Sequence, residues 1–227
     1  RCNVAVSSGA PISPEILSFF RKIGVPIREA YGLTEASGAT TMQPSDMSPV
    51  GTVGVSYPGV EVKLADDGEI LISGNVVFVG YYKNEAATRE AIDAEGWLHT
   101  GDVAKWEEGP AGRELRIIDR KKDIIIRGGE NIYPREVEEF LYQHPAISEV
   151  QVFGIADAKM GEEVCAWIQL NAGHALTEQD VKNYCADQIT HFKVPRHIRF
   201  VTEYPMTVTG KIQKFVMSEQ MLASLQG

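Results

Sequence analysis

Hydrophobic residues follow two different periods along the chain, and each period predicts a kind of element. Over the first thirty residues, a short buried strand is predicted at 3–7, a helix from an apolar stripe with helical spacing, and a second strand at 26–30. The stripe is expected to face the core and consists of Ile16, Phe19, Phe20 and Ile23. Ser13 suits the N-cap of this helix and Pro14 its first turn. In such a unit, ligand sites lie beyond the C-terminal ends of the strands.

A period of two begins near residue 51 and continues to residue 79. In this β-rich segment, apolar and polar positions alternate on both sides of the turn Asp67-Gly68. The apolar positions are Val60, Val62, Leu64, Ile70 and Ile72. A short helix capped by Asn84 follows, and two strands are predicted near 103–107 and 114–118.

After residue 123 the pattern becomes a compact alternation of strands and helices, so a domain boundary is expected at 119–123. Pro134 is suited to open one helix, and Thr177-x-x-Asp180 resembles the capping box of another, which places Cys185 in the core. Strands are predicted at 124–127, 150–153, 164–170 and 197–202. A terminal amphipathic helix is expected to bury Ile212, Phe215, Val216 and Leu222.

Composition and charge narrow the class of protein. The chain has 227 residues, of which 44% are hydrophobic and 23% charged, as in ordinary globular proteins. The formal net charge of -9 argues against nucleic acid or an anionic membrane as the main partner. Three cysteines without a C-x-x-C pair favour a reducing compartment over a disulfide framework or a zinc ribbon. No apolar run approaches the ~20 residues that span a bilayer, so no integral membrane segment is expected.

Several common motifs are excluded by their spacing. Gly210-Lys211 is not a Walker loop, because Pro205 stands where its first glycine belongs and Ile212 where Ser or Thr belongs. No two of the 21 glycines have the G-x-G spacing of a dinucleotide fingerprint. The five histidines lack the i, i+4 pairing of a helical zinc site, and there is no G-x-S-x-G elbow of a serine hydrolase.

One polar segment offers nucleotide chemistry. Tyr31-Gly32-Leu33-Thr34-Glu35 follows a predicted strand and combines an aromatic ring, a small residue, a hydroxyl and a carboxylate. An aromatic ring can stack on a base, a hydroxyl can bind phosphate oxygens and a carboxylate can hold magnesium. Taken alone, this segment would be interpreted as a plain turn with a surface glutamate.

The 31–35 segment and three further polar segments, all predicted to be loops, together resemble the ordered signatures of the adenylate-forming superfamily. The other three are Leu98-His99-Thr100-Gly101-Asp102, Asp119-Arg120-Lys121-Lys122-Asp123 with the 126–132 run, and the 205–211 segment that ends in Gly210-Lys211. The superfamily includes acyl-CoA synthetases, luciferase and peptide-synthetase adenylation domains. The Gly-Gly-Glu-Asn-Ile-Tyr-Pro run is most similar to fatty or aromatic acid:CoA ligases, with the medium-chain branch closest.

The resemblance implies a fold, a reaction and three cofactors. The fold is α/β and α+β: residues 1–118 would end a large N-terminal domain, 119–123 would be a hinge, and 124–227 would form a small mobile domain. A carboxylic acid would react with ATP to give an acyl-adenylate, and coenzyme A would then displace AMP. By similarity Thr34 binds phosphate, Glu35 coordinates magnesium, and Tyr31 stacks on adenine. Gly9, Ala10 and Pro11 would line the other side of the base.

Two further residues are assigned to the nucleotide by the same resemblance. Asp102 would accept hydrogen bonds from both ribose hydroxyls, and the alternative is a turn-forming aspartate after Gly101. Arg120 would contact ribose or phosphate, and the alternative is a solvated basic run shared with Lys121 and Lys122.

The remaining assignments concern the second domain. Lys211 would bridge the carboxylate substrate and the α-phosphate, where a solvated lysine is the plain alternative. Lys122 would be the hinge. Gly128 and Gly129 would let the pantetheine arm pass against backbone, although a turn before a helix also needs glycine. Lys159, Lys193 and Arg196 are candidate partners of the CoA phosphates, with scattered surface charge as the alternative.

The front of the family pattern is missing. No Ser/Thr/Gly-rich phosphate loop precedes the 31–35 segment, and the chain starts without Met, so we expect the C-terminal part of a longer synthetase. Its partners would be a medium- or long-chain carboxylic acid, ATP and CoA, in the cytoplasm or alternatively the mitochondrial matrix. A peptide-synthetase adenylation domain, a luciferase-like enzyme and a non-catalytic nucleotide-binding module are the other functions considered.

Overall fold

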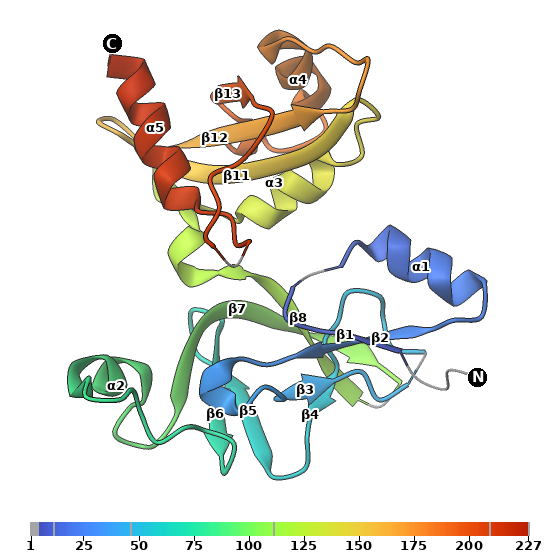
Figure 1. Cartoon of the computed structure of the whole chain (residues 1–227), viewed down its shortest axis with the longest axis vertical. Helices are drawn as coiled ribbons and strands as arrows, with labels where there is room; N and C mark the ends of the chain where they lie inside the picture. Colours follow the sequence, from blue (N-terminus) through green and yellow to red (C-terminus); the bar gives the residue numbers. More distant parts are fainter. Residues whose placement is uncertain (1–4, 11, 46, 111, 209, 227) are drawn as a thin grey trace. The chain divides into compact units, whose positions relative to one another are not determined.

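The computed structural model describes residues 5–10, 12–45, 47–110, 112–208 and 210–226. The chain divides into two compact units, Arg1–Lys121 and Lys122–Gly227. The division falls inside the 119–123 segment in which the change of sequence pattern suggests a boundary. Each unit has its own sheets and core, and each is described by itself below (Figure 1).

The first unit begins with the expected strand, helix and strand. Strands β1 (Ala5–Ser7) and β2 (Ile27–Tyr31) are parallel neighbours, and helix α1 (Pro14–Lys22) connects them. Ser13 caps the helix by accepting a hydrogen bond from the Glu15 N–H, and Pro14 stands at its start, as predicted. Two short antiparallel strands complete the sheet, β3 (Thr41–Met42) and β4 (Val55–Ser56).

The buried face of α1 differs from the prediction. Leu17 is the buried residue of the helix, whereas the expected core residues Ile16, Phe19 and Ile23 are 46%, 58% and 57% exposed. The helix contacts β2 of the small sheet, and three residues of the stripe that is apolar by sequence remain at the surface. A cluster of large exposed apolar side chains is unusual on a soluble protein and typical of a surface that another segment covers.

A second, antiparallel sheet of four strands forms the larger part of the unit. Its order is β5 (Val60–Leu64), β6 (Glu69–Gly74), β7 (Leu98–Gly109) and β8 (Gly112–Arg120). The last two strands are longer than predicted. Helix α2 (Glu85–Ala91) lies beside β7, and Asn84 caps it through the Ala87 N–H, as expected. The core below this sheet is built around Ile70, Ile72, Leu98 and Leu115, each at most 1% exposed.

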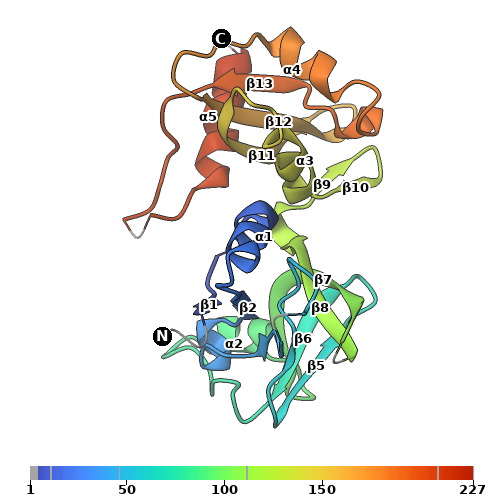
Figure 2. The same ribbon diagram turned by 90° about the vertical axis from the view of Figure 1, so that its right-hand side faces the viewer.

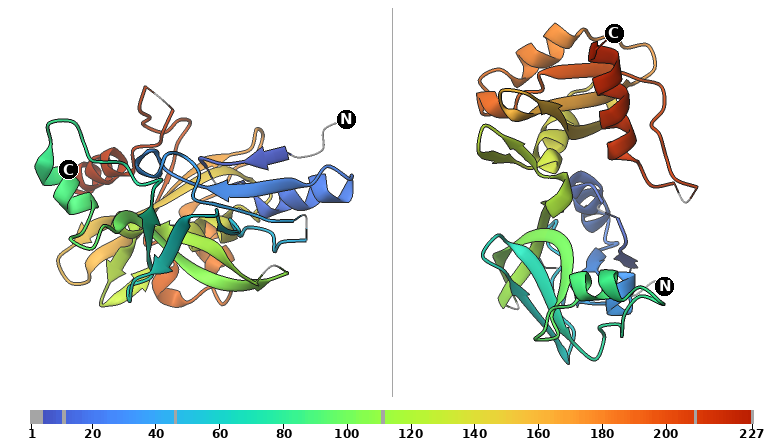
Figure 3. Two further views of the ribbon diagram at one scale, coloured as in Figure 1. Left: turned by 90° about the horizontal axis from the view of Figure 1, so that it is seen from below. Right: turned by 90° about the vertical axis from the view of Figure 1, so that its left-hand side faces the viewer.

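The second unit is a sheet with helices on both faces. Its strands are β9 (Ile125–Arg127), β10 (Glu130–Ile132), β11 (Ile147–Asp157), β12 (Gly161–Leu170) and β13 (His197–Phe200). Alternate residues of β11 and β12 point to opposite faces. One face packs against α3 (Pro134–Leu141) and α4 (Glu178–Cys185), and the other against α5 (Lys214–Gln226). Figure 2 and the right view of Figure 3 show α5 running along that second face.

Most local signals of this unit are confirmed. Pro134 begins α3, the capping box of Thr177 and Asp180 is formed at α4, and Cys185 is fully buried. The predicted face of α5 is wrong in part, because Phe215 is 64% exposed whereas Met217 and Met221 are the buried residues. Within the described part of the chain, no helix is long and apolar enough to cross a membrane.

Candidate active site

The segment that carries Asp102 is a bulge inside β7, not a loop between strands as predicted. Glu69 of β6 pairs with Val103 of β7, and Leu71 pairs with His99, so three residues of β7 lie opposite the single residue Ile70. Gly101 has a φ of +71°, which an L side chain rarely adopts. A bulge bends its strand and re-aims the side chains that it carries, which is why bulges are frequent beside active sites.

Asp102 is held from two sides in this bulge. The Tyr31 hydroxyl donates a hydrogen bond of 2.7 Å to Asp102 Oδ2, although the two residues are 71 positions apart. The Arg120 Nε lies 3.6 Å from Asp102 Oδ1. Burial, and then the charge of Asp102, raises the pKa of Tyr31, so its hydroxyl is a donor at neutral pH. The structure thus brings together three of the predicted nucleotide residues from β2, β7 and β8.

Thr34 and Glu35 follow β2 in a 3-10 turn, η1 (Thr34–Ala36). The turn passes so close to Gly38 that a Cβ on Gly32 would lie 1.8 Å from the Gly38 carbonyl oxygen, so position 32 requires glycine. Thr34 is exposed at the start of the turn, and Glu35 is half-buried. Gly9 and Ala10, at the end of β1, are exposed, and Pro11 lies outside the described residues.

Glu35 has a partner that the sequence did not suggest. The Tyr81 hydroxyl donates a 2.7 Å hydrogen bond to Glu35 Oε1, and this hydrogen bond raises the pKa of Tyr81. Within the described residues, no three His, Cys, Asp or Glu side chains gather as a ready metal site. One carboxylate fits magnesium nevertheless, because this ion usually binds through one or two carboxylates together with substrate phosphates and water.

The basic run at the boundary is not uniformly solvated. Lys121 is exposed, and its Nζ lies 2.7 Å from Asp67 Oδ2 and 3.0 Å from Glu69 Oε2, so this surface lysine is ion-paired. Lys122 is exposed and lies in a 3-10 turn, η2 (Lys121–Asp123). The hinge role of Lys122 stays a prediction.

In the second unit, Gly128 and Gly129 form the two-residue turn of the β9–β10 hairpin. Their φ angles of +59° and +89° match the turn type that needs positive φ at both positions. The hairpin was not predicted, because this run was expected to be a turn directly before a helix. The turn itself accounts for both glycines, and their contact with pantetheine remains a prediction.

Two of the three candidate CoA partners, Lys193 and Arg196, form ion pairs within the second unit. Arg127 and Arg196 both bind the buried Glu163, with N–O distances of 2.6 and 2.9 Å. Lys193 binds Glu136 at 2.5 Å. The contact of Lys193 and Arg196 with the CoA phosphates stays a prediction.

Lys211 is presented by a small closed loop. Met206 and Ile212 form a β-bridge at its base, the Thr207 N–H donates to the Lys211 carbonyl at 2.8 Å, and the Lys211 N–H donates to Thr207 Oγ1 at 3.0 Å. The Lys211 side chain is exposed at the end of this loop. Thr209 lies outside the described residues. The backbones of Thr207 and Lys211 are thus bonded to each other while the Lys211 side chain is exposed.

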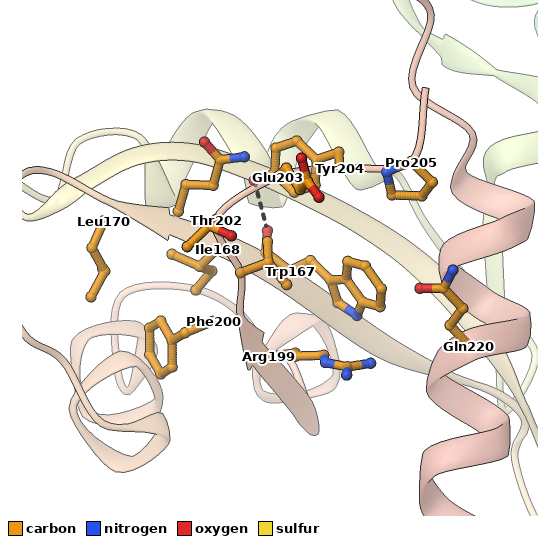
Figure 4. A pocket seen from close by; sticks show the side chains of 12 residues that line it. Trp167, Ile168, Leu170, Arg199, Phe200, Thr202, Glu203, Tyr204, Pro205 and Gln220 are labelled. Atoms are coloured by element: carbon orange, nitrogen blue, oxygen red, sulfur yellow. Dashed lines mark hydrogen bonds between the residues drawn. The ribbon is translucent and has the colours of Figure 1, made fainter. Parts of the chain in front are cut away.

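Both ends of this loop are anchored to the core. Before it, Tyr204 is 7% exposed and its hydroxyl donates to the Trp167 carbonyl at 3.2 Å (Figure 4). After it, Lys214 Nζ binds Glu138 Oε1 at 2.8 Å. An open groove beside Tyr204 is lined by Trp167, Arg199 and Gln220 among others, and none of the predicted site residues lines it.

Two family models match the chain. Residues 2–82 match the AMP-binding enzyme, and residues 136–211 match the AMP-binding enzyme C-terminal domain. The chain belongs to the adenylate-forming AMP-binding enzymes. The first match contains Tyr31, Thr34 and Glu35, and the second ends at Lys211.

Related AMP-binding enzymes share the sequence beyond these two matches. The putative acyl-CoA synthetase YngI of Bacillus subtilis (strain 168) is 43% identical over 233 residues, which cover 96% of this chain and 42% of that protein. The mitochondrial medium-chain acyl-CoA ligase ACSF2 of Homo sapiens is 42% identical over 232 residues, which cover 95% of this chain and 37% of the relative. The chain spans about two fifths of the length of these curated relatives.

Solved structures of AMP-binding enzymes have the same fold. ATP-bound MatB from Rhodopseudomonas palustris is 31% identical with a TM-score of 0.87, over 96% of this chain and 45% of that one. The o-succinylbenzoate CoA synthetase MenE from Bacillus subtilis, in complex with an acyl-adenylate intermediate, is 29% identical with a TM-score of 0.83, over 92% and 44%. The mixed α/β fold class predicted from the sequence is confirmed.

Proposed function

We propose that the chain is part of an ATP-dependent, AMP-forming acid:CoA ligase that acts on a medium- or long-chain fatty acid. The observation that carries this proposal is the gathering of Tyr31, Asp102 and Arg120 at the bulge of β7. The exposed Thr34 and the half-buried Glu35 follow Tyr31 in sequence. Sequence identity of 42% and 43% with two acyl-CoA synthetases over nearly the whole chain supports this proposal. The activity is proposed for the complete enzyme, because this chain spans about two fifths of the length of its curated relatives.

The proposed reaction has two steps. In the first, a carboxylate oxygen attacks the α-phosphorus of ATP, the bond to the β-phosphate oxygen breaks, and pyrophosphate leaves. In the second, the CoA thiol attacks the acyl carbon, the carbon–oxygen bond to AMP breaks, and the thiol proton passes to solvent. Charge builds on phosphate oxygens in the first step, so cations aimed at them lower its barrier. Lys211, Arg120 and a magnesium ion held by Glu35 would supply this charge.

The test is pyrophosphate release by the complete enzyme across a panel of carboxylic acids of increasing chain length, with and without CoA. We expect release that depends on the acid, with medium- or long-chain acids best, and an acyl-CoA product when CoA is present. ATP binding without pyrophosphate release for any acid would indicate the non-catalytic nucleotide-binding module instead. Transfer of an amino acid to a carrier domain would indicate a peptide-synthetase function.

Asp102→Asn should weaken ATP binding by roughly tenfold to a hundredfold, the cost of one or two hydrogen bonds to a charged acceptor. The amide oxygen can still accept the Tyr31 hydroxyl bond, so the fold should survive, but the amide cannot accept both ribose hydroxyls. Calorimetric titration with ATP measures the change. Unchanged affinity with a lowered melting temperature would support the structural-turn interpretation of Asp102.

Tyr81→Phe should raise the magnesium concentration needed for half-maximal pyrophosphate release by roughly tenfold, because outer hydrogen bonds orient a metal-binding carboxylate. The matched control is Tyr82→Phe, since the adjacent Tyr82 is 87% exposed and has no recorded hydrogen bond to Glu35. If both variants required the same magnesium concentration as the wild type, Tyr81 would have no role in holding Glu35 for the metal.

A further inference from the structure

We infer that Glu69 is a positioning residue. It joins the bulge that carries Asp102 to Lys121, the last residue of the first unit. Lys122 is then the first residue whose backbone dihedral angles can change. This inference rests on the proposed function and concerns the link between its two half-reactions. Glu69 touches no predicted substrate position. It acts through the groups that it holds.

Burial marks Glu69 as a structural carboxylate of this unit. It is 5% exposed and stands at the start of β6, where the following residues Ile70, Leu71 and Ile72 are all core. A buried carboxylate destabilises a fold unless hydrogen bonds and opposite charges surround it. Burial raises the pKa of Glu69, but bonds from Lys121, His99 and the Gly101 N–H outweigh it and hold the pKa below its ordinary value.

One oxygen of Glu69 shapes the bulge. Its Oε1 accepts a 2.9 Å hydrogen bond from the Gly101 N–H, a backbone donor that the extra residues of β7 leave without a ladder partner on β6. Thr100 completes the bulge, because its hydroxyl donates to the Ile70 carbonyl and accepts from the Asp102 N–H. The backbone on both sides of Gly101 is thereby fixed directly before Asp102.

The other oxygen of Glu69 holds the end of the unit. Its Oε2 accepts a 3.0 Å bond from Lys121 Nζ and lies 3.2 Å from His99 Nδ1. Asp67 binds the same ammonium at 2.7 Å, and Asp93 lies 3.6 Å from His99 Nε2. These are the charged groups facing Glu69 that the structure records.

These bonds hold the Lys121 side chain in place at the unit boundary. The side chain of Lys121 binds two carboxylates on the β5–β6 side of the sheet, whereas Lys122 is exposed and its side chain forms no hydrogen bond or ion pair with the residues that the structure describes. If the second unit rotates, the change in backbone dihedral angles therefore has to occur after Lys121. The carboxylate that sets the position of Asp102 thus also sets where the second unit begins to turn.

The test uses Glu69→Gln in the complete enzyme. The amide oxygen of glutamine can still accept the Gly101 N–H, but its neutral group cannot form the ion pair with Lys121. We expect the KM for ATP in pyrophosphate release to stay within about twofold, while acyl-CoA formation from synthetic acyl-AMP falls roughly tenfold. Lys121→Met should reduce the same step, and the double variant should be no worse than either single one, because residues that act through one contact are not additive.

The matched control is Asp66→Asn, which neutralises the exposed carboxylate next to Asp67 that forms no ion pair with Lys121, and it should change either half-reaction by less than about twofold. Equal losses in both half-reactions with a lowered melting temperature, or additive losses in the double variant, would show that Glu69 only supports the fold. An unchanged thioester step in Glu69→Gln would also overturn the inference.

A readout without turnover separates this inference from the proposed function. Hydrogen exchange followed by mass spectrometry should show exchange at 119–123 accelerated at least about tenfold in Glu69→Gln, with exchange at 99–103 little changed. If the wild type made no acyl-CoA, the proposed function would fall, whereas the exchange pattern would still decide the role of Glu69. Unchanged exchange at 119–123 in Glu69→Gln would contradict the positioning role of Glu69.

Discussion

Lys211→Ala in the complete enzyme should reduce the rate of acyl-adenylate formation by about a hundredfold or more, the usual cost of removing one group that stabilises developing charge. The loop around Lys211 is closed by backbone bonds to Thr207 and anchored by Tyr204 and Lys214, so truncating the exposed side chain should leave the loop in place. Thioester formation from synthetic acyl-AMP should survive. Single-turnover assays of the two half-reactions measure the difference.

The matched control is Lys182→Ala, which removes a lysine whose recorded partner is Glu178 of the same helix and should leave both half-reactions unchanged. Acetylation of Lys211 should reproduce the alanine variant, because it removes the same charge. Equal losses in the two half-reactions of Lys211→Ala would rule out a role specific to adenylation.

Lys122→Pro should leave single-turnover pyrophosphate release near normal and abolish most acyl-CoA formation, even from synthetic acyl-AMP. Proline fixes φ near -65° and restricts the residue before it, so the backbone at the unit boundary loses the freedom that two orientations require. Lys121 is the restricted neighbour, and its ion pairs with Asp67 and Glu69 already limit how it can adapt. Resemblance to the family suggests that the adenylating orientation tolerates proline.

Lys122→Ala serves as the control, because it removes the side chain and keeps the backbone free, and its effect should be mild. Full thioester formation by the proline variant would place the hinge at another residue. The boundary at 119–123 would then have no functional support.

Local signals in the sequence predicted local structure well. The caps Ser13, Asn84 and Thr177 and the helix start at Pro134 depend on bonds within a few residues, and all are present in the structure. Burial on helices was predicted less well. On α5 the methionines Met217 and Met221 pack against β11 and β12 while Phe215 is exposed, because the spacing of apolar residues alone does not decide which side of a helix meets the sheet.

The site was predictable as a set of residues but not as an arrangement. Motif order identified Tyr31 and Asp102, yet their hydrogen bond joins positions 71 apart and depends on a bulge that only strand pairing reveals. Glu69 had one signal in the sequence, a carboxylate placed directly before the apolar run 70–72. Tyr81 had none, because its partner Glu35 is 46 residues away in another loop.

The central claim is that a carboxylate oxygen attacks the α-phosphorus of ATP and leaves with AMP. The most direct measurement supplies a fatty acid labelled with ¹⁸O in its carboxylate, together with ATP and CoA, and determines the mass of the products of the complete enzyme. One ¹⁸O atom is expected in AMP and one in the acyl-CoA. Unlabelled AMP, or ADP with labelled inorganic phosphate, would contradict it.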